Sequence, residues 1–422
     1  MNSQPTLMTH QIEAADFLAA RPMALLADEA GAGKTASTVA ACDKIGAKRI
    51  LVCCPAALRE NWKNEFDTWG NPDSNRELFV VSHESIALAS ESDLQRVQFD
   101  VIIVDESHRL RSFQARRTAR FYGSTGLCMK SAYLWTLSGT PIVNSAADLY
   151  PFFHGGWVRA GVAPMGWLEF CQKFTSLVPD AWSGQKPVGL RNAGELADRL
   201  RNVFLRRTLD EVGVILPRLD VHRISFDLPE GVVATILKDL DGWSEQKFLE
   251  ALEMKDEIRD TALQRARRGV GTAKVAALIP LISASNLPAV IFYVHKDVRD
   301  AYRSYLGANT PVIDGETSRD KLKTIQLEFK LGLHPYLLVQ MQAGGVGLTL
   351  TTACDVIVGE LPWTAAELWQ AIKRVHRITQ VRNVRAAVPF ANNCWLDRVL
   401  IATIDRKHKA SENFLRLLKY GE

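Results

Sequence analysis

The chain has 422 residues, of which 47% are hydrophobic and 23% charged, so it can bury two or three domain cores and is not disordered throughout. Lysine and arginine total 51 against 47 aspartates and glutamates, which excludes a strongly basic protein and requires any nucleic-acid track to be local. Seven cysteines without C-x-x-C spacing predict reduced, structural thiols. The sequence shows no leader pattern and no run of about 18 apolar residues, so we expect a cytoplasmic protein.

Alternating strand and helix patterns predict two α/β halves. In the first half, apolar runs typical of parallel strands lie at Met23–Ala27, Arg49–Cys54, Leu78–Val81, Val101–Val104 and Tyr133–Leu137. The second half has candidate strands at Ala289–Val294, Pro311–Ile313, Tyr336–Gln340, Asp355–Val358 and Ala386–Pro389. Residues 148–207 and 230–281 read as mainly helical insertions, with a Trp/Gly/Pro-rich loop at residues 179–190. We therefore expect two doubly wound parallel-sheet lobes with helical insertions, at residues 1–217 and 218–422.

The run DEAGAGKT at Asp28–Thr35 has the spacing of a phosphate-binding loop. Glycines at positions 31 and 33 let backbone N–H groups turn toward phosphate oxygens, Lys34 reaches the outer phosphates, and Thr35 can place its hydroxyl on a magnesium ion. A strand pattern precedes the run and a helix pattern follows it, so an anion would also meet a helix N-terminus. Asp28 stands where the full pattern has glycine. The run predicts a bound nucleotide.

The run FDVIIVDESH at Phe99–His108 predicts a buried parallel strand that ends in two carboxylates. Ligands of open α/β sheets bind beyond the carboxyl ends of the strands, where Asp105 and Glu106 would project. Asp105 would hold magnesium, and Glu106 would orient and deprotonate the attacking water. In the alternative reading, Asp105 caps the next helix and Glu106 lies in its solvated first turn.

The run ELWQAIKRVHRITQ at Glu367–Gln380 predicts one amphipathic helix. Its buried stripe would contain Leu368, Ile372 and Val375. The opposite stripe would present Gln370, Arg374 and Arg377. Guanidinium groups suit a transferring phosphoryl group because they stay charged and offer several donors, although they also fit surface positions near a helix end.

Three groups of basic residues are candidates for a local nucleic-acid track, and each also fits a solvated helix face. They are Arg109, Arg111, Arg116, Arg117 and Arg120; Arg199, Arg201, Arg206 and Arg207; and Arg265, Arg267, Arg268 and Lys274.

In their order and spacing, these motifs resemble the Swi/Snf-type ATPases, double-stranded-DNA translocases of helicase superfamily two. The resemblance spans nearly the whole chain. Further pieces that carry it are THQ at Thr9–Gln11, Ile50–Phe66, Val80–Ile86, LSGTPIVNSAADLY at Leu137–Tyr150, FLRRT at Phe204–Thr208, Leu216–Pro217 and QAGGVGLTLTTA at Gln342–Ala353.

The resemblance implies two RecA-like lobes that bind ATP with Mg²⁺. It assigns ATP binding to Gln11, which reads adenine, and to Asp28, Gly31, Ala32, Gly33, Lys34 and Thr35. It assigns the metal to Thr35 and Asp105. It assigns catalysis to Lys34, Glu106, Arg374 and Arg377, with the two arginines completing the site on lobe closure. It assigns coupling to His108, Ser138, Gly139, Thr140 and Gln370.

The resemblance also implies a monomeric motor that grips double-stranded or branched DNA through its phosphates, with protein partners unknown. Candidate contacts are Arg59, Lys63, Ser82, His83, Lys296, Gly345 and Thr349. Because Arg59 and Lys63 lie four residues apart, they also fit an ordinary solvated helix face.

Finer details are similar to the HARP-like annealing-helicase branch of this family. Ser107, Thr349 and ELPW at Glu360–Trp363 carry this similarity, whereas Thr379 replaces a glycine common in the family. We expect the chain to lack the branch's accessory modules, which favours a bacterial or viral setting.

Three functions remain open from the sequence. The first is a DNA-stimulated ATPase that translocates on duplex DNA and remodels junctions or protein–DNA complexes. The second is a strand-separating helicase of RNA or single-stranded DNA. The third is a nucleotide-gated, nucleic-acid-binding subunit of a restriction or recombination complex.

Overall fold

The computed structural model describes residues 5–88, 93–180, 184–254, 258, 260–284, 288–341 and 348–420. The chain forms two compact units. Unit 1 contains Met1–Val214 and Lys409–Glu422, and unit 2 contains Ile215–His408. The first boundary lies close to the expected one at residue 217. The expectation that the second lobe runs to residue 422 is wrong, because the last residues of the chain belong to unit 1.

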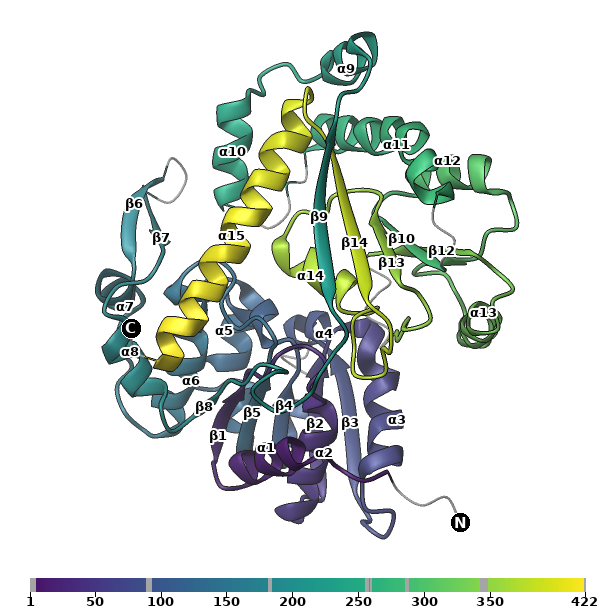
Figure 1. Cartoon of the computed structure of the whole chain (residues 1–422). Coiled ribbons are helices and arrows are strands. Elements are labelled where there is room, and N and C mark those ends of the chain that lie inside the picture. Colours follow the sequence, from purple (N-terminus) through teal and green to yellow (C-terminus); the bar gives the residue numbers. More distant parts are fainter. Residues whose placement is uncertain are drawn as a thin grey trace. The chain divides into compact units, whose positions relative to one another are not determined.

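Unit 1 is built on a six-stranded sheet in which all neighbouring strands are parallel (Figure 1). In spatial order the strands are β3 (Glu77–Ser82), β2 (Arg49–Cys54), β4 (Phe99–Val104), β5 (Ser131–Leu137), β1 (Met23–Leu26) and β8 (Phe204–Leu205). Its first helices are α1 (Thr9–Ala19), α2 (Lys34–Lys44), α3 (Arg59–Trp69), α4 (His83–Leu88) and α5 (Arg116–Tyr122). Short 3-10 helices are η1 (Ala56–Leu58), η3 (Asp93–Arg96), η4 (Ser107–Leu110), η5 (Leu127–Met129) and η6 (Ala146–Leu149).

The strands of this sheet are buried as their sequences predict. Every residue of β2 after Arg49 is buried, and so is every residue of β4 except Asp100. Strands with this pattern are covered on both faces, as parallel strands between helical layers are. The five strands predicted for this half are confirmed. Strand β8 was missed because two residues are too short to show a period.

The insertion after β5 is only partly helical. Its helices are α6 (Tyr150–Arg159), α7 (Trp167–Phe174) and α8 (Ala193–Leu200). Strands β6 (Ser176–Asp180) and β7 (Gly184–Val188) pair antiparallel, so the prediction of a loop at residues 179–190 is wrong. The pairing of the two short strands supplies backbone hydrogen bonds that a loop would lack.

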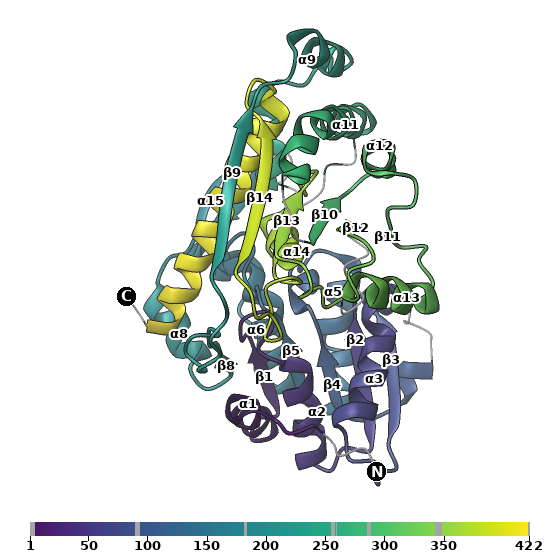
Figure 2. The ribbon, with the colours of Figure 1, turned by 45° about the vertical axis from the view of Figure 1, so that its right-hand side comes forward.

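Unit 2 repeats the architecture with a second six-stranded parallel sheet (Figure 2). Its strands in spatial order are β11 (Val312–Ile313), β12 (Tyr336–Gln340), β10 (Ala289–Tyr293), β13 (Asp355–Val358), β14 (Val384–Ala391) and β9 (Leu219–Phe226). Its helices are α9 (Glu230–Leu237), α10 (Glu245–Met254), α11 (Thr261–Ser283), α12 (Lys296–Leu306), α13 (Arg319–Lys330) and α14 (Ala365–Ile372). The prediction of two α/β lobes on parallel sheets is confirmed.

Strand β9 is the main element of unit 2 that the sequence did not reveal. Figure 2 shows it running beside β14, with which it pairs along eight residues. Its residues are mostly half-buried, because it lies at the sheet edge and lacks the continuous apolar run of a central strand.

Helix α15 (Trp395–Tyr420) contains the residue at which the chain returns to unit 1. Its last turns carry Phe414, Leu415 and Leu418, which are buried in a unit 1 cluster with Ile142. The hydroxyl of Ser411 donates to the carbonyl of Ile142 over 2.7 Å. These contacts explain why residues 409–422 belong to unit 1.

All seven cysteines are buried and free, which agrees with reduced, structural thiols. Among the described residues, no helix has the length and hydropathy needed to cross a bilayer.

A buried ion pair joins α11 to α15 inside unit 2. The Nζ of Lys274 lies 2.9 Å from Asp397, and the two side chains are 1% and 8% exposed. The same carboxylate accepts from the backbone N–H of Ala391, and the lysine donates to the carbonyl of Pro389. Lys274 is therefore a structural cation, not part of a nucleic-acid track.

We predict that Lys274→Met lowers the free energy of unfolding by about 3–5 kcal/mol, because it leaves Asp397 buried without a counter-ion. Arg265→Met is the matched control on the same helix, since Arg265 pairs with Asp239 and both side chains are 61% exposed. It should change the free energy by about 0–1 kcal/mol. Urea unfolding of both variants decides; equal losses would contradict the assignment.

Candidate active site

The phosphate-binding loop lies in unit 1 between the end of β1 and the start of α2. Gly31 and Gly33 have φ of 97° and 80°, values that glycine adopts without strain. A Cβ atom on Gly33 would lie 2.0 Å from the side-chain nitrogen of Gln11. Gly33 therefore permits both the turn and the close approach of the residue predicted to read adenine.

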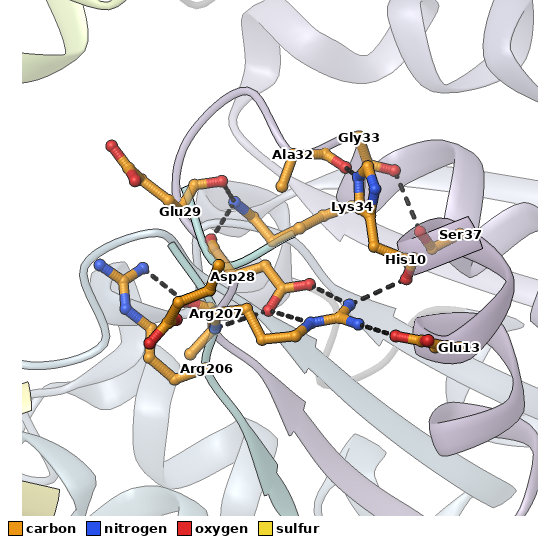
Figure 3. Close-up of polar contacts among 12 residues, drawn as sticks. His10, Glu13, Asp28, Glu29, Ala32, Gly33, Lys34, Ser37, Arg206 and Arg207 are labelled. Carbon is orange, nitrogen blue, oxygen red and sulfur yellow. Dashed lines mark hydrogen bonds and ion pairs between the residues drawn. The ribbon is translucent and has the colours of Figure 1, made fainter. Parts of the chain in front are cut away.

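Lys34, the first residue of α2, folds back onto the loop (Figure 3). Its Nζ donates to the main-chain carbonyls of Asp28 and Glu29 over 2.7 and 3.2 Å. Burial lowers the pKa of Lys34, although nearby carboxylates, first Glu106, oppose that shift. A phosphate oxygen would replace neutral carbonyls with a charged acceptor and so favour the protonated lysine.

Asp28 pairs with Arg207, which follows β8 (Figure 3). The Oδ2 atom of Asp28 lies 2.6 Å from a terminal guanidinium nitrogen, and the aspartate is only 2% exposed. Its Oδ1 atom accepts from the backbone N–H and Nε of Arg207. The arginine also donates to Glu13 and to the carbonyl of His10. The structure thus commits the carboxylate of Asp28, predicted as an ATP-binding group, to holding β8 and α1 to the loop.

Arg206 contacts the loop and the segment after β5. One terminal nitrogen donates to the carbonyls of Ala27 and Gly139 over 2.6 and 3.3 Å. A Cβ atom on Gly139 would lie 3.6 Å from the Nζ of Lys34, so Gly139 packs directly against the loop. Arg206 and Arg207 are turned inward in the fold, and the interpretation of these two residues as part of a nucleic-acid track is wrong.

The two carboxylates of DESH lie beyond the end of β4. Burial and the neighbouring Glu106 raise the pKa of Asp105, although Trp62, whose indole N–H donates to it over 2.9 Å, favours the charged form. Glu106 has a positive φ of 48°, which is unusual for a residue with a side chain. A cation would relieve the unfavourable pairing of the two carboxylates, so the arrangement fits a magnesium ion at Asp105.

Magnesium usually takes one or two protein carboxylates together with phosphate oxygens and water. Asp105 and the hydroxyl of Thr35, in the first turn of α2, are the groups that this chain offers for it. Among the described residues, no cluster of three or more His, Cys, Asp or Glu side chains could hold a metal alone.

His108 connects the carboxylates to the residues after β5. Its Nδ1 lies 3.0 Å from the hydroxyl of Ser138 and 3.3 Å from a carboxylate oxygen of Glu106. Ser138 in turn accepts from the backbone N–H of Thr140. Burial, with Arg111 and Arg109 nearby, lowers the pKa of His108 to about 3, so the ring is neutral. This is the contact that a coupling role for His108 requires; the role itself stays a prediction.

Two contacts of this site were not predicted. His10, buried in α1, bonds through Nε2 to the carbonyl of Ala32 over 3.0 Å. Trp62, on α3, donates its indole N–H to Asp105. The THQ motif was a signal for His10, but nothing in the local sequence connects Trp62 to a residue 43 positions away.

In unit 2, the prediction of one helix over Glu367–Gln380 is wrong. Helix α14 ends at Ile372, so Gln370 lies in the helix, whereas Arg374 and Arg377 lie in the turns that follow. The backbone N–H of Leu350 donates to the carbonyl of Arg374, and the side chain of Gln380 donates to the carbonyls of Ala353 and Val375. These tertiary hydrogen bonds replace the helical ones. The predicted apolar stripe of Leu368, Ile372 and Val375 is fully buried.

The candidate DNA contacts fall into three groups. Arg59 and Lys63 are exposed on α3, and Lys63 pairs with Glu60. Lys296, half-exposed at the start of α12, pairs with Glu316, and Thr349 accepts from Arg377. Gly345 lies outside the described residues.

Ser82 and His83 are buried, at 6% and 0% exposure, so neither side chain is available to a phosphate. Burial lowers the pKa of His83 to about 4, which keeps it neutral. The prediction that these two side chains contact phosphates directly is therefore wrong.

The chain matches models of two known families. A model described as "SNF2-related domain" matches residues 10–88 and 74–232, together more than half of the chain, and one described as "Helicase conserved C-terminal domain" matches residues 273–379.

Among curated proteins, the DNA annealing helicase and endonuclease ZRANB3 of Mus musculus is 25% identical, covering 93% of this chain and 39% of its own. The SWI/SNF-related matrix-associated actin-dependent regulator of chromatin subfamily A-like protein 1 of Xenopus laevis is 28% identical, covering 90% and 41%. The chain thus spans about two fifths of the length of these relatives. A solved structure of the Sulfolobus solfataricus SWI2/SNF2 ATPase core in complex with dsDNA is 20% identical, with a TM-score of 0.43, covering 92% of this chain and 89% of that one.

The Asp28–Arg207 pair gives a test of the site's construction. Arg207→Ala leaves a buried carboxylate uncompensated, so we expect a loss of about 3–5 kcal/mol in the free energy of unfolding and weaker binding of a fluorescent ATP analogue. Adding Asp28→Asn removes the stranded charge and should restore most of the stability.

Arg201→Ala is the control, because Arg201 forms an ion pair with Asp198 in which both side chains are well exposed. It should cost about 0–1 kcal/mol. A double variant no more stable than Arg207→Ala would show that the pair does not hold the loop.

Proposed function

Because the chain belongs to the SNF2-related family, we propose that it is a DNA-stimulated ATPase that translocates on double-stranded DNA and remodels DNA junctions or protein–DNA complexes. The observation that carries the proposal is the meeting, in unit 1, of the lysine-bearing loop, the carboxylate pair and the His108–Ser138 contact. The names of the relatives, which include DNA annealing helicases, support DNA as the polymer.

In the proposed reaction, the loop N–H groups and Lys34 hold the phosphates of ATP, and Gln11 contacts the adenine. Glu106 orients the attacking water and takes its proton, a role that requires the ionised carboxylate. A magnesium ion bound at Asp105 and Thr35 would neutralise charge on the phosphates. His108 stays neutral and couples Glu106, through its contacts, to Ser138.

Arg374 and Arg377 are proposed to stabilise charge on the transferring phosphoryl group. Arg377 at present donates to the carbonyl of Leu348 and the hydroxyl of Thr349, each over 3.3 Å. These are neutral acceptors at ordinary distance, so a phosphate oxygen would be a stronger acceptor for the same guanidinium. We further propose that the motor works as a monomer in the cytoplasm of a bacterial or virus-infected cell.

Steady-state ATP hydrolysis with duplex DNA, forked DNA, single-stranded DNA, RNA or no nucleic acid tests the function. We expect stimulation selective for duplex DNA. Glu106→Gln should bind ATP and lower turnover at least about 100-fold, because it removes the general base. Stimulation by RNA alone would favour the strand-separating helicase, and binding without turnover under every condition would favour a nucleotide-gated subunit.

Arg377→Ala tests the role of unit 2. We expect nucleotide affinity in unit 1 to be nearly unchanged and DNA-stimulated hydrolysis to fall about 10³-fold, as for the loss of an arginine that acts only in the transition state. Arg382→Ala is the control, because Arg382 donates to the carbonyl of Thr352 in the same region. Unchanged hydrolysis in Arg377→Ala would remove this arginine from the mechanism.

A further inference from the structure

A cavity separate from the phosphate-binding loop lies in unit 1, beside β8. It has a volume of about 500 Å³ and is bounded by α8, β8 and the last turn of α15. None of the residues predicted to bind ATP lines it, but Arg206 does. Cavities of about 300–1,000 Å³ are the size at which proteins bind small organic ligands.

Arg206 is the unusual group in this cavity. Burial lowers its pKa, which reflects the cost of holding a guanidinium away from water, although the carboxylates of Glu29, Asp28, Glu211 and Glu412 oppose the shift. In Figure 3 its guanidinium points away from the Asp28–Arg207 pair. It donates to the neutral carbonyls of Ala27 and Gly139, and no described carboxylate forms an ion pair with it. An anion entering the cavity would give Arg206 a direct ion pair.

The other charged groups at the cavity largely neutralise one another. Lys419 pairs with Glu211, which also accepts from Tyr420, and Arg201 pairs with Asp198. Among the charged side chains that line the cavity, Arg206 is therefore the cation that forms no direct ion pair with a described carboxylate. Guanidinium groups favour phosphate because two N–H donors can bind two of its oxygens.

The remaining walls are apolar and aromatic. Leu200, Phe204 and Leu418 line the cavity, and Tyr420 lies with them. A ligand with one charged end and a small apolar or aromatic body would match both kinds of wall. We propose that this cavity is a second ligand site, distinct from the ATP site, which binds a small organic phosphate through Arg206.

Arg206 also gives the site a connection to ATP binding. The nitrogen that faces the carbonyls of Ala27 and Gly139 holds the two segments that flank Lys34. The charge of Arg206 acts on Lys34, and neutralising it would make the loop less attractive to phosphates. Occupation of the cavity should therefore weaken ATP binding about fivefold, and ATP should weaken occupation equally. Only this coupling rests on the proposed function.

Phenyl phosphate is the probe, titrated by calorimetry into the full chain saturated with Mg·ADP, so that the loop is already filled. We expect one equivalent to bind. Gly194→Phe should abolish binding by filling the cavity, since a Cβ atom at Gly194 meets nothing within 4 Å. Gly166→Phe is the matched control at an equally open glycine outside the cavity and should bind normally. Arg206→Met should weaken binding at least tenfold.

The outcomes separate cleanly. No heat with Mg·ADP present, or binding unchanged in Gly194→Phe, would overturn the second site whether or not Arg206→Met folds. If phenyl phosphate binds as expected but does not change the Michaelis constant for ATP, the coupling alone is overturned. A chain that binds phenyl phosphate but never hydrolyses ATP would overturn the proposed function and leave the second site standing.

Discussion

The buried ion pair between Asp28 and Arg207 is the interaction on which the nucleotide site depends. It joins the first residue of the phosphate loop to the segment that follows the edge strand β8. Through the same guanidinium it also joins the loop to α1. A buried carboxylate is stable only with a partner, so the loop, β8 and α1 must assemble together. The aspartate at the position where a simpler phosphate loop has glycine thus has a structural reason: it fastens the edge of the sheet to the loop.

The parts of this fold that follow from local sequence were predictable. β2 and β13 have the predicted bounds because a continuous buried run of this length has few alternatives. The loop glycines and Lys34 lie where their motif places them, because the positive φ angles that shape the loop are set by residues within the motif itself. Strands β8, β6 and β7 escaped prediction because their described residues are half-buried or exposed and form no continuous buried run.

The misses at the site have a different cause, since they depend on partners far away in the sequence. Arg207 lies 179 positions from Asp28, and its sequence neighbours predicted only one of several exposed arginines. The region of Arg374 and Arg377 has a helical period, yet helix α14 ends at Ile372, and the carbonyl of Arg374 accepts from the distant backbone N–H of Leu350. The candidate reactive groups of unit 1 lie in local motifs, whereas the residues that hold them are distant in the sequence.

The contacts of the candidate groups also explain how the loop keeps its shape. The successive carbonyls of Ala27, Asp28 and Glu29 point to two cations, Arg206 and Lys34. In the proposed reaction Lys34 turns to a phosphate, whereas the carbonyl of Ala27 keeps its bond to Arg206 and the side chain of Asp28 keeps its bond to Arg207. The loop therefore exchanges one donor on binding nucleotide and retains the rest, which limits the reorganisation that binding requires. In this arrangement Lys34 is the cation that serves the nucleotide, whereas Arg206 and Arg207 keep their contacts with the loop.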